Sequence, residues 1–209
     1  MDAMPEITKT LADLPRFLWL LTLLCLLALP GTPALAAEPK ASIAVEQKDD
    51  IFIVDASIDV DVPLVMAWAV LTDFEHMPSI FENLKTSKIT ARDGNTVRVH
   101  QDGVAKYGFL SFFFTAEREI RLEPMQRIQT KNLSGTLKSM ESEVLIIARE
   151  HSVKIIYHAA ILPDSMLARM FGASFVRHEV EEQFLGISRE MMRRQALAAL
   201  PEKSSPAKN

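Results

Sequence analysis

Cysteine is almost absent from this 209-residue sequence, and glycine is scarce. The single cysteine, Cys25, lies in an apolar run near the N-terminus, so residues 37–209 contain none. Disulfides, thiolate catalysis and cysteine-based metal sites are therefore excluded from that part of the chain. The seven glycines are scattered and form no phosphate-binding loop. The five histidines show no metal-ligand spacing, so we expect neither a metal nor any other cofactor.

The chain also lacks a surplus of charge of either sign. Its formal net charge is −4, and acidic and basic residues are interspersed along it. Without a basic stripe, we expect no nucleic-acid partner. Apolar residues make up 48% of the sequence, which is enough for a hydrophobic core, and the length predicts one domain.

An uncharged apolar run occupies residues 17–29 and follows Arg16. Small residues at Ala34 and Ala36 then have the spacing that a signal peptidase requires. The pattern predicts a signal peptide over residues 1–36 and a mature protein that is periplasmic or secreted. The alternative is an uncleaved membrane anchor, but thirteen residues span only about 20 Å as a helix.

The rest of the chain predicts an α+β domain over residues 37–200. Residues 50–62 alternate, with one wholly apolar face, as a half-buried strand does. We expect a helix over 64–73, a second helical turn over 79–84 and turns at 93–94 and 102–103. Further antiparallel strands are predicted over 85–91, 96–101, 107–122, 127–133, 137–148 and 153–162. Residues 201–209 are predicted to be a disordered tail.

A long C-terminal helix is predicted over residues 166–200. Apolar residues recur at spacings of three and four and form a stripe on one face of this helix. The stripe consists of Met166, Met170, Ala173, Val180, Phe184, Ile187 and Met191. We expect this stripe to pack on the sheet.

The segment from Val60 to Ile89 has a more specific pattern: a valine-rich strand, a proline, a helix with a tryptophan, and then Leu-Thr-Asp-Phe. It resembles the START-like (SRPBCC) superfamily, in particular its polyketide cyclase/dehydrase and lipid-transport branch. The matching residues are Val62, Pro63, Trp68, Leu71, Thr72, Asp73, Phe74, Met77, Pro78 and Ser87. The resemblance implies a helix-grip fold, in which a curved antiparallel sheet wraps around the long C-terminal helix. It implies no shared catalytic residues.

Arg118 is the most informative candidate for a binding site. It shares one strand face with Phe112, Phe114, Ala116 and Ile120, so this face is otherwise apolar. A cation on such a face requires an anionic partner or a ligand group. The alternative is a bulge or edge position that turns Arg118 to solvent.

Other side chains are candidates for the wall of the same cavity. Tyr157 is the polar-tipped member of an apolar strand face and could donate a hydrogen bond to a ligand, or it could simply be packed in the core. The apolar candidates are Trp68, Phe74, Phe112, Phe114, Met170 and Phe184. For Trp68 and Phe74 the alternative is that they seal the helix against the sheet. Asp73 is expected to cap the local backbone.

These features predict an exported protein that binds a hydrophobic small molecule, such as a lipid, an isoprenoid or an aromatic metabolite. A transient contact with a membrane would accompany that role. Two alternatives stay open. One is a cyclase or dehydratase that uses Arg118, Tyr157 or His158 in the same cavity. The other is an envelope interaction protein with a filled core and no ligand.

Overall fold

The structure is a computed structural model that describes residues 40–107, 110–163 and 165–200. For residues 107, 110 and 165–171 it describes the backbone only. The predicted signal peptide (1–36), the predicted tail (201–209) and the side chain of Met170 therefore lie outside what is described. No helix in the described ranges has the length and apolar character needed to cross a bilayer.

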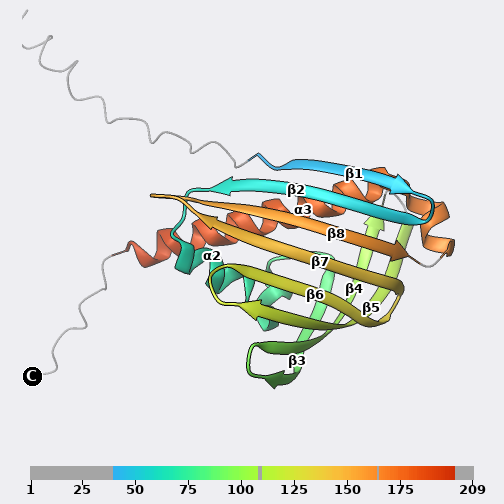
Figure 1. Ribbon diagram of the computed structural model, residues 1–209, viewed down its shortest axis with the longest axis horizontal. Coiled ribbons are helices and arrows are strands. Elements are labelled where there is room, and N and C mark those ends of the chain that lie inside the picture. The colour runs from blue at the N-terminus through green and yellow to red at the C-terminus, as the bar shows by residue number, and fades with distance from the viewer. Residues whose placement is uncertain (1–39, 108–109, 164, 201–209) are drawn as a thin grey trace, which may run out of the picture. The chain divides into compact units, whose positions relative to one another are not determined.

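The described strands form one antiparallel sheet in the order β1-β2-β8-β7-β6-β5-β4-β3 (Figure 1). Their bounds are β1 (Ser42–Lys48), β2 (Ile51–Val60), β3 (Leu84–Asp93), β4 (Thr96–Tyr107), β5 (Leu110–Glu123), β6 (Arg127–Gly135), β7 (Leu137–Ala148) and β8 (Val153–Pro163). The alternation predicted for residues 50–62 is confirmed, because the apolar face of β2 from Phe52 to Val60 is buried throughout. This apolar face of β2 lies on the inner side of the sheet.

Two sequence predictions about the strands were wrong. The first strand, β1, was missed, because its segment SIAVEQK contains too few apolar residues to reveal a buried face. Residues 102–103 were predicted to be a turn, but β4 runs through them and pairs Gly103 with Phe114 of β5. Gly103 is required there because a Cβ atom would lie 2.3 Å from the carbonyl oxygen of Asn83 and 2.3 Å from the Phe114 ring. This glycine allows a close packing contact and does not mark a turn.

Two short helices connect β2 to β3. Pro63 precedes α2 (Leu64–Leu71), where its fixed φ suits the start of a helix. The 3₁₀ helix η1 (Phe74–Ser79) follows, so the second helical turn overlaps the predicted range 79–84 only at Ser79. Ala67, Val70 and Leu71 are buried and form the face of α2 that packs against the core.

The long helix α3 (Ser165–Ala198) runs along the inner side of the curved sheet and contacts β1, β2, β8 and α2 (Figure 1). It is interrupted at Gly172, whose φ of 63° and ψ of −177° are not helical. The predicted stripe is confirmed from Val180 to Met191, because Val180, Phe184 and Met191 are buried and Ile187 packs, partly buried, against the core, while Ala173 is half-buried. The helix-grip fold expected from the sequence is therefore confirmed, apart from the kink at Gly172.

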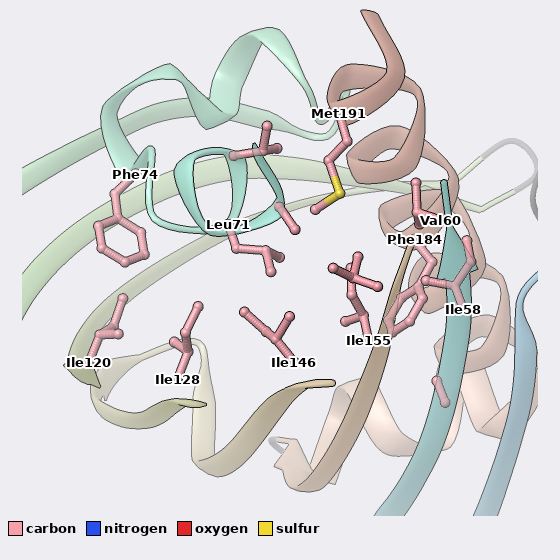
Figure 2. Close-up of a cluster of buried hydrophobic side chains, with 14 of the residues drawn as sticks. Ile58, Val60, Leu71, Phe74, Ile120, Ile128, Ile146, Ile155, Phe184 and Met191 are labelled. Carbon is pink, nitrogen blue, oxygen red and sulfur yellow. The ribbon is translucent and has the colours of Figure 1, made fainter. Parts of the chain in front are cut away.

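The hydrophobic core fills the end of the domain at α2. Figure 2 shows side chains from β2 and from β5 to β8 pointing toward Leu71, Phe74 and Phe184. The core residues of the sheet include Ile58, Ile120, Ile128, Ile146 and Ile155, and all five are at most 7% exposed.

Candidate functional site

A cavity of about 380 Å³ lies between the inner face of the sheet, the α2–η1 segment and α3. Most of the side chains that line it are apolar. Its described wall includes Ile58, Leu71, Phe74, Met77, Phe81, Ala105, Phe112, Phe114, Ala116, Ile120, Ile128, Leu137, Met140, Val144, Ile155, Ile161, Phe175, Val176, Val180, Phe184 and Ile187. The volume falls in the range of pockets that hold small molecules.

Arg118 projects into this cavity from β5. The β5–β6 ladder contains an irregularity between Glu117 and Arg118, yet the side chain of Arg118 does not turn to solvent. Its buried Nε atom has no hydrogen-bond partner, and no carboxylate among the described residues forms an ion pair with it. Burial lowers the pKa of Arg118, although the nearby Tyr157 opposes this shift. A guanidinium stays protonated in proteins, so the cavity wall carries an uncompensated cation.

Tyr157 enters the cavity from β8, close to Arg118. Its ring packs edge-to-face against Phe184 of α3, with ring centroids 6.1 Å apart. Burial raises the pKa of the Tyr157 hydroxyl, while Arg118 and a hydrogen bond with Ser142 partly offset the increase. The hydroxyl is therefore neutral near pH 7 and can donate or accept a hydrogen bond.

Several polar residues of the cavity wall were not predicted from the sequence. Asn83 donates a hydrogen bond of 2.6 Å from Nδ2 to Oε2 of Glu179 and so links the start of β3 to α3. Burial raises the pKa of Glu179. Gln101 is buried and donates a 3.1 Å hydrogen bond to Oγ of Ser87. Gln101 could have been found by extending the inward alternation of residues 97 and 99, whereas Asn83 could not.

Of the seven predicted site residues whose side chains are described, six line the cavity: Phe74, Phe112, Phe114, Arg118, Tyr157 and Phe184. Trp68 does not line it. It lies at the flank of the buried face of α2 and packs, partly buried, against the hydrophobic core. His158 also lies elsewhere, because it is exposed on the outer face of the sheet, where its Nδ1 atom is 2.7 Å from Oδ1 of Asp55.

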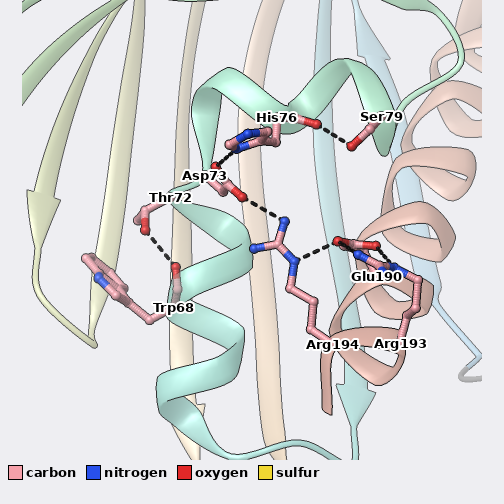
Figure 3. A network of polar contacts seen from close by, with 8 residues as sticks. All are labelled: Trp68, Thr72, Asp73, His76, Ser79, Glu190, Arg193 and Arg194. Atoms are coloured by element: carbon pink, nitrogen blue, oxygen red, sulfur yellow. Dashed lines mark hydrogen bonds and ion pairs between the residues drawn. The ribbon is translucent and has the colours of Figure 1, made fainter. Parts of the chain in front are cut away.

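Asp73 was expected to cap the local backbone, but its side chain makes no such bond. It accepts hydrogen bonds from His76 (2.6 Å) and from Arg194 of α3 (2.7 Å), as Figure 3 shows. Burial disfavours the charged carboxylate, but these two bonds outweigh it and lower the pKa of Asp73. Hydrogen bonds from Arg193, and then from Arg194, lower the pKa of Glu190 to about 2. This network lies outside the cavity wall and fastens η1 to α3.

The described residues contain no group of three or more His, Cys, Asp or Glu side chains that could hold a metal ion. The described polar groups of the cavity wall are one guanidinium, one phenol, the half-buried carboxyl group of Glu179 and several amides and hydroxyls.

The eight-stranded curved sheet closed by a long C-terminal helix defines a START-like, helix-grip protein. The sequence matches the family described as polyketide cyclase / dehydrase and lipid transport over residues 60–183, and the chain belongs to this family. A search of curated proteins found no match to the sequence.

Solved structures share the fold at low sequence identity. The Zhui aromatase/cyclase from Streptomyces sp. R1128 is 15% identical, with a TM-score of 0.63 over 71% of this chain and 98% of that one. A START superfamily protein from Mycobacterium smegmatis is 13% identical, with a TM-score of 0.55 over 70% and 99%. The lipid transfer and protein localization domain of human StarD13 is also 13% identical, with a TM-score of 0.57 over 86% and 98%.

Proposed function

We propose that this protein binds a hydrophobic small molecule, such as a lipid, an isoprenoid or an aromatic metabolite, between its sheet and α3. The observation that carries the proposal is the largely apolar cavity of about 380 Å³, which side chains leave unfilled. Burying an apolar ligand in such a space removes apolar surface of both partners from water. The family description, which includes lipid transport, supports this function.

Binding of a neutral fluorescent probe tests the proposal. N-phenylnaphthylamine should bind the full chain saturably, and its fluorescence should rise as it leaves water. Ala105 is half-buried on the cavity wall, so Ala105→Trp should fill part of the space and weaken binding at least about tenfold.

The matched control is Ala91→Trp, because Ala91 is exposed on β3 and does not line the cavity. This variant should bind the probe as the parent does, and circular dichroism should show that both variants are folded. A parent protein that does not bind the probe saturably would instead support an envelope interaction protein without a ligand. Equal binding by the parent and Ala105→Trp would also contradict the proposal.

A cyclase or dehydratase acting in the same cavity is the second candidate. Glu179 favours it, because its carboxyl group lines the cavity and burial raises its pKa, as suits a general acid. The shared fold of the Zhui aromatase/cyclase gives further support. His158 has no part in this candidate, since it lies on the outer face. An enzyme would convert a bound ligand to a product of different mass or structure, whereas a carrier would return it unchanged.

We also propose that the protein acts outside the cytoplasm after removal of residues 1–36. The support is the sequence pattern of residues 16–36, with its short apolar run and the small residues Ala34 and Ala36. N-terminal sequencing of the protein from fractionated cells should give a chain that begins near Ala37. Intact Met1 in a membrane fraction would contradict this and indicate a retained anchor.

A further inference from the structure

The inner end of the cavity is closed by the packed core of the domain. Along the inner face of the sheet, Ile120 follows Arg118 on β5 and Ile155 precedes Tyr157 on β8. Ile120 and Ile155 are 5% and 3% exposed and belong to the same buried cluster as Leu71 of α2 (Figure 2). This packing leaves no space for a ligand beyond Arg118 and Tyr157, so these two side chains lie at the closed end of the cavity.

In the opposite direction the cavity continues along β5 toward the surface. Phe114 and Phe112 occupy further inward positions of this strand and line the cavity. Phe113, which also belongs to the cavity wall, is 84% exposed, so the wall reaches the surface here. In an extended strand the distance from Phe112 to Arg118 is about 20 Å, a length that suits one extended apolar chain.

Arg118 is a cation without a partner charge at the closed end. Its buried Nε atom has no hydrogen-bond partner, and no carboxylate within the described ranges forms an ion pair with it. The neighbouring strands β6, β7 and β8 add Thr130, Ser142 and Tyr157 to this part of the wall. These three side chains are neutral near pH 7, so they supply hydrogen bonds but no negative charge.

Glu179 of α3 is the only acidic residue in the described cavity wall, and it does not neutralise Arg118. Its Oε2 atom accepts a 2.6 Å hydrogen bond from Asn83, and the charges that act on it are those of His178 and Glu182. Burial raises the pKa of Glu179, whereas an adjacent guanidinium would lower it. The charge of Arg118 is therefore left for a ligand to balance.

We propose that the natural ligand is an anionic amphiphile with a single apolar part. Its anionic group binds Arg118 and Tyr157 at the closed end, and its apolar part lies along Phe114 and Phe112. A carboxylate or a phosphate has the required chemistry, because both accept paired hydrogen bonds from a guanidinium. This inference rests on the proposed binding function and adds the class of ligand and its orientation.

Three ligands with the same apolar chain test the selectivity for charge. Near neutral pH, dodecanoic acid is anionic, 1-dodecanol is neutral and dodecylamine is cationic, and each is measured in competition with N-phenylnaphthylamine. The acid should bind the protein at least about tenfold more tightly than the alcohol, and the amine should bind more weakly than the alcohol. An acid that binds no better than the alcohol, or an amine that binds at least as well, would overturn the inference.

Arg118→Met tests whether this cation binds the anionic group. The change should weaken dodecanoic acid by about 10- to 100-fold, the value of a charge-assisted hydrogen bond, and leave 1-dodecanol unchanged. Arg121→Met is the matched control, because Arg121 is exposed on the same strand and does not line the cavity. This control should bind the acid as the parent does.

The outcomes separate the two proposals. A protein that binds neither N-phenylnaphthylamine nor any of the three ligands would contradict both the binding function and the anionic ligand. Binding of the probe without a preference for the acid, or a preference that survives Arg118→Met, would contradict the anionic ligand alone. The comparison of acid, alcohol and amine uses the unaltered protein, so it decides the question even if Arg118→Met does not fold.

Discussion

Phe184→Asp is expected to lower the free energy of unfolding by more than about 3 kcal/mol. Phe184 is 8% exposed on the inner face of α3, and its ring packs edge-to-face on Tyr157. The substitution removes this packing and puts a carboxylate in an apolar wall. Urea unfolding followed by circular dichroism measures the change.

Arg189→Asp is the matched control for this experiment. Arg189 is exposed on the same helix, so the change should cost less than about 1 kcal/mol even though it alters the net charge by more. If Phe184→Asp were as stable as the parent, α3 would not pack on the sheet through this stripe.

Gly103→Ala is expected to cost about 2 to 3 kcal/mol, although it adds a single methyl group. The new Cβ atom would lie 2.3 Å from the carbonyl oxygen of Asn83. That oxygen accepts a 2.7 Å hydrogen bond from the backbone N–H of Val104, so it cannot retreat without loss. The cost should appear as a lower midpoint in thermal or urea unfolding.

Gly94→Ala separates steric crowding from the general effect of replacing a glycine. Gly94 has a φ of +53°, but nothing lies within 4 Å of the position of its Cβ atom. Its replacement should therefore cost only about 1 kcal/mol, the penalty for a left-handed backbone conformation. A Gly103→Ala protein at least as stable as Gly94→Ala would show that the contact with Asn83 is not tight.

The sequence predicted most of the fold, because each long element carries its own periodicity. The alternation along β2 and the three-and-four spacing from Val180 to Met191 identify buried faces without any knowledge of their partners. One error, the turn predicted at residues 102–103, occurs where a residue serves a distant contact. Gly103 is a glycine because the backbone of Asn83 approaches it, and nothing near residues 102–103 in the sequence reveals this.

The candidate site was predictable one strand at a time but not as a whole. Arg118 and Tyr157 are visible as polar members of apolar strand faces, and both line the cavity. Thr130 and Ser142 join them only through the register between β6 and β7, which depends on the lengths and shapes of turns. Asp73 was misjudged for the same reason, because its partner Arg194 is 121 residues further along the chain.

Native mass spectrometry of the protein purified from the cells that naturally produce it tests whether the cavity holds a ligand. We expect a population with one bound small molecule, which organic solvent releases and which is lost from Ala105→Trp but not from Ala91→Trp. The bare protein mass alone, from a preparation that also fails to bind N-phenylnaphthylamine, would contradict a binding function for the cavity.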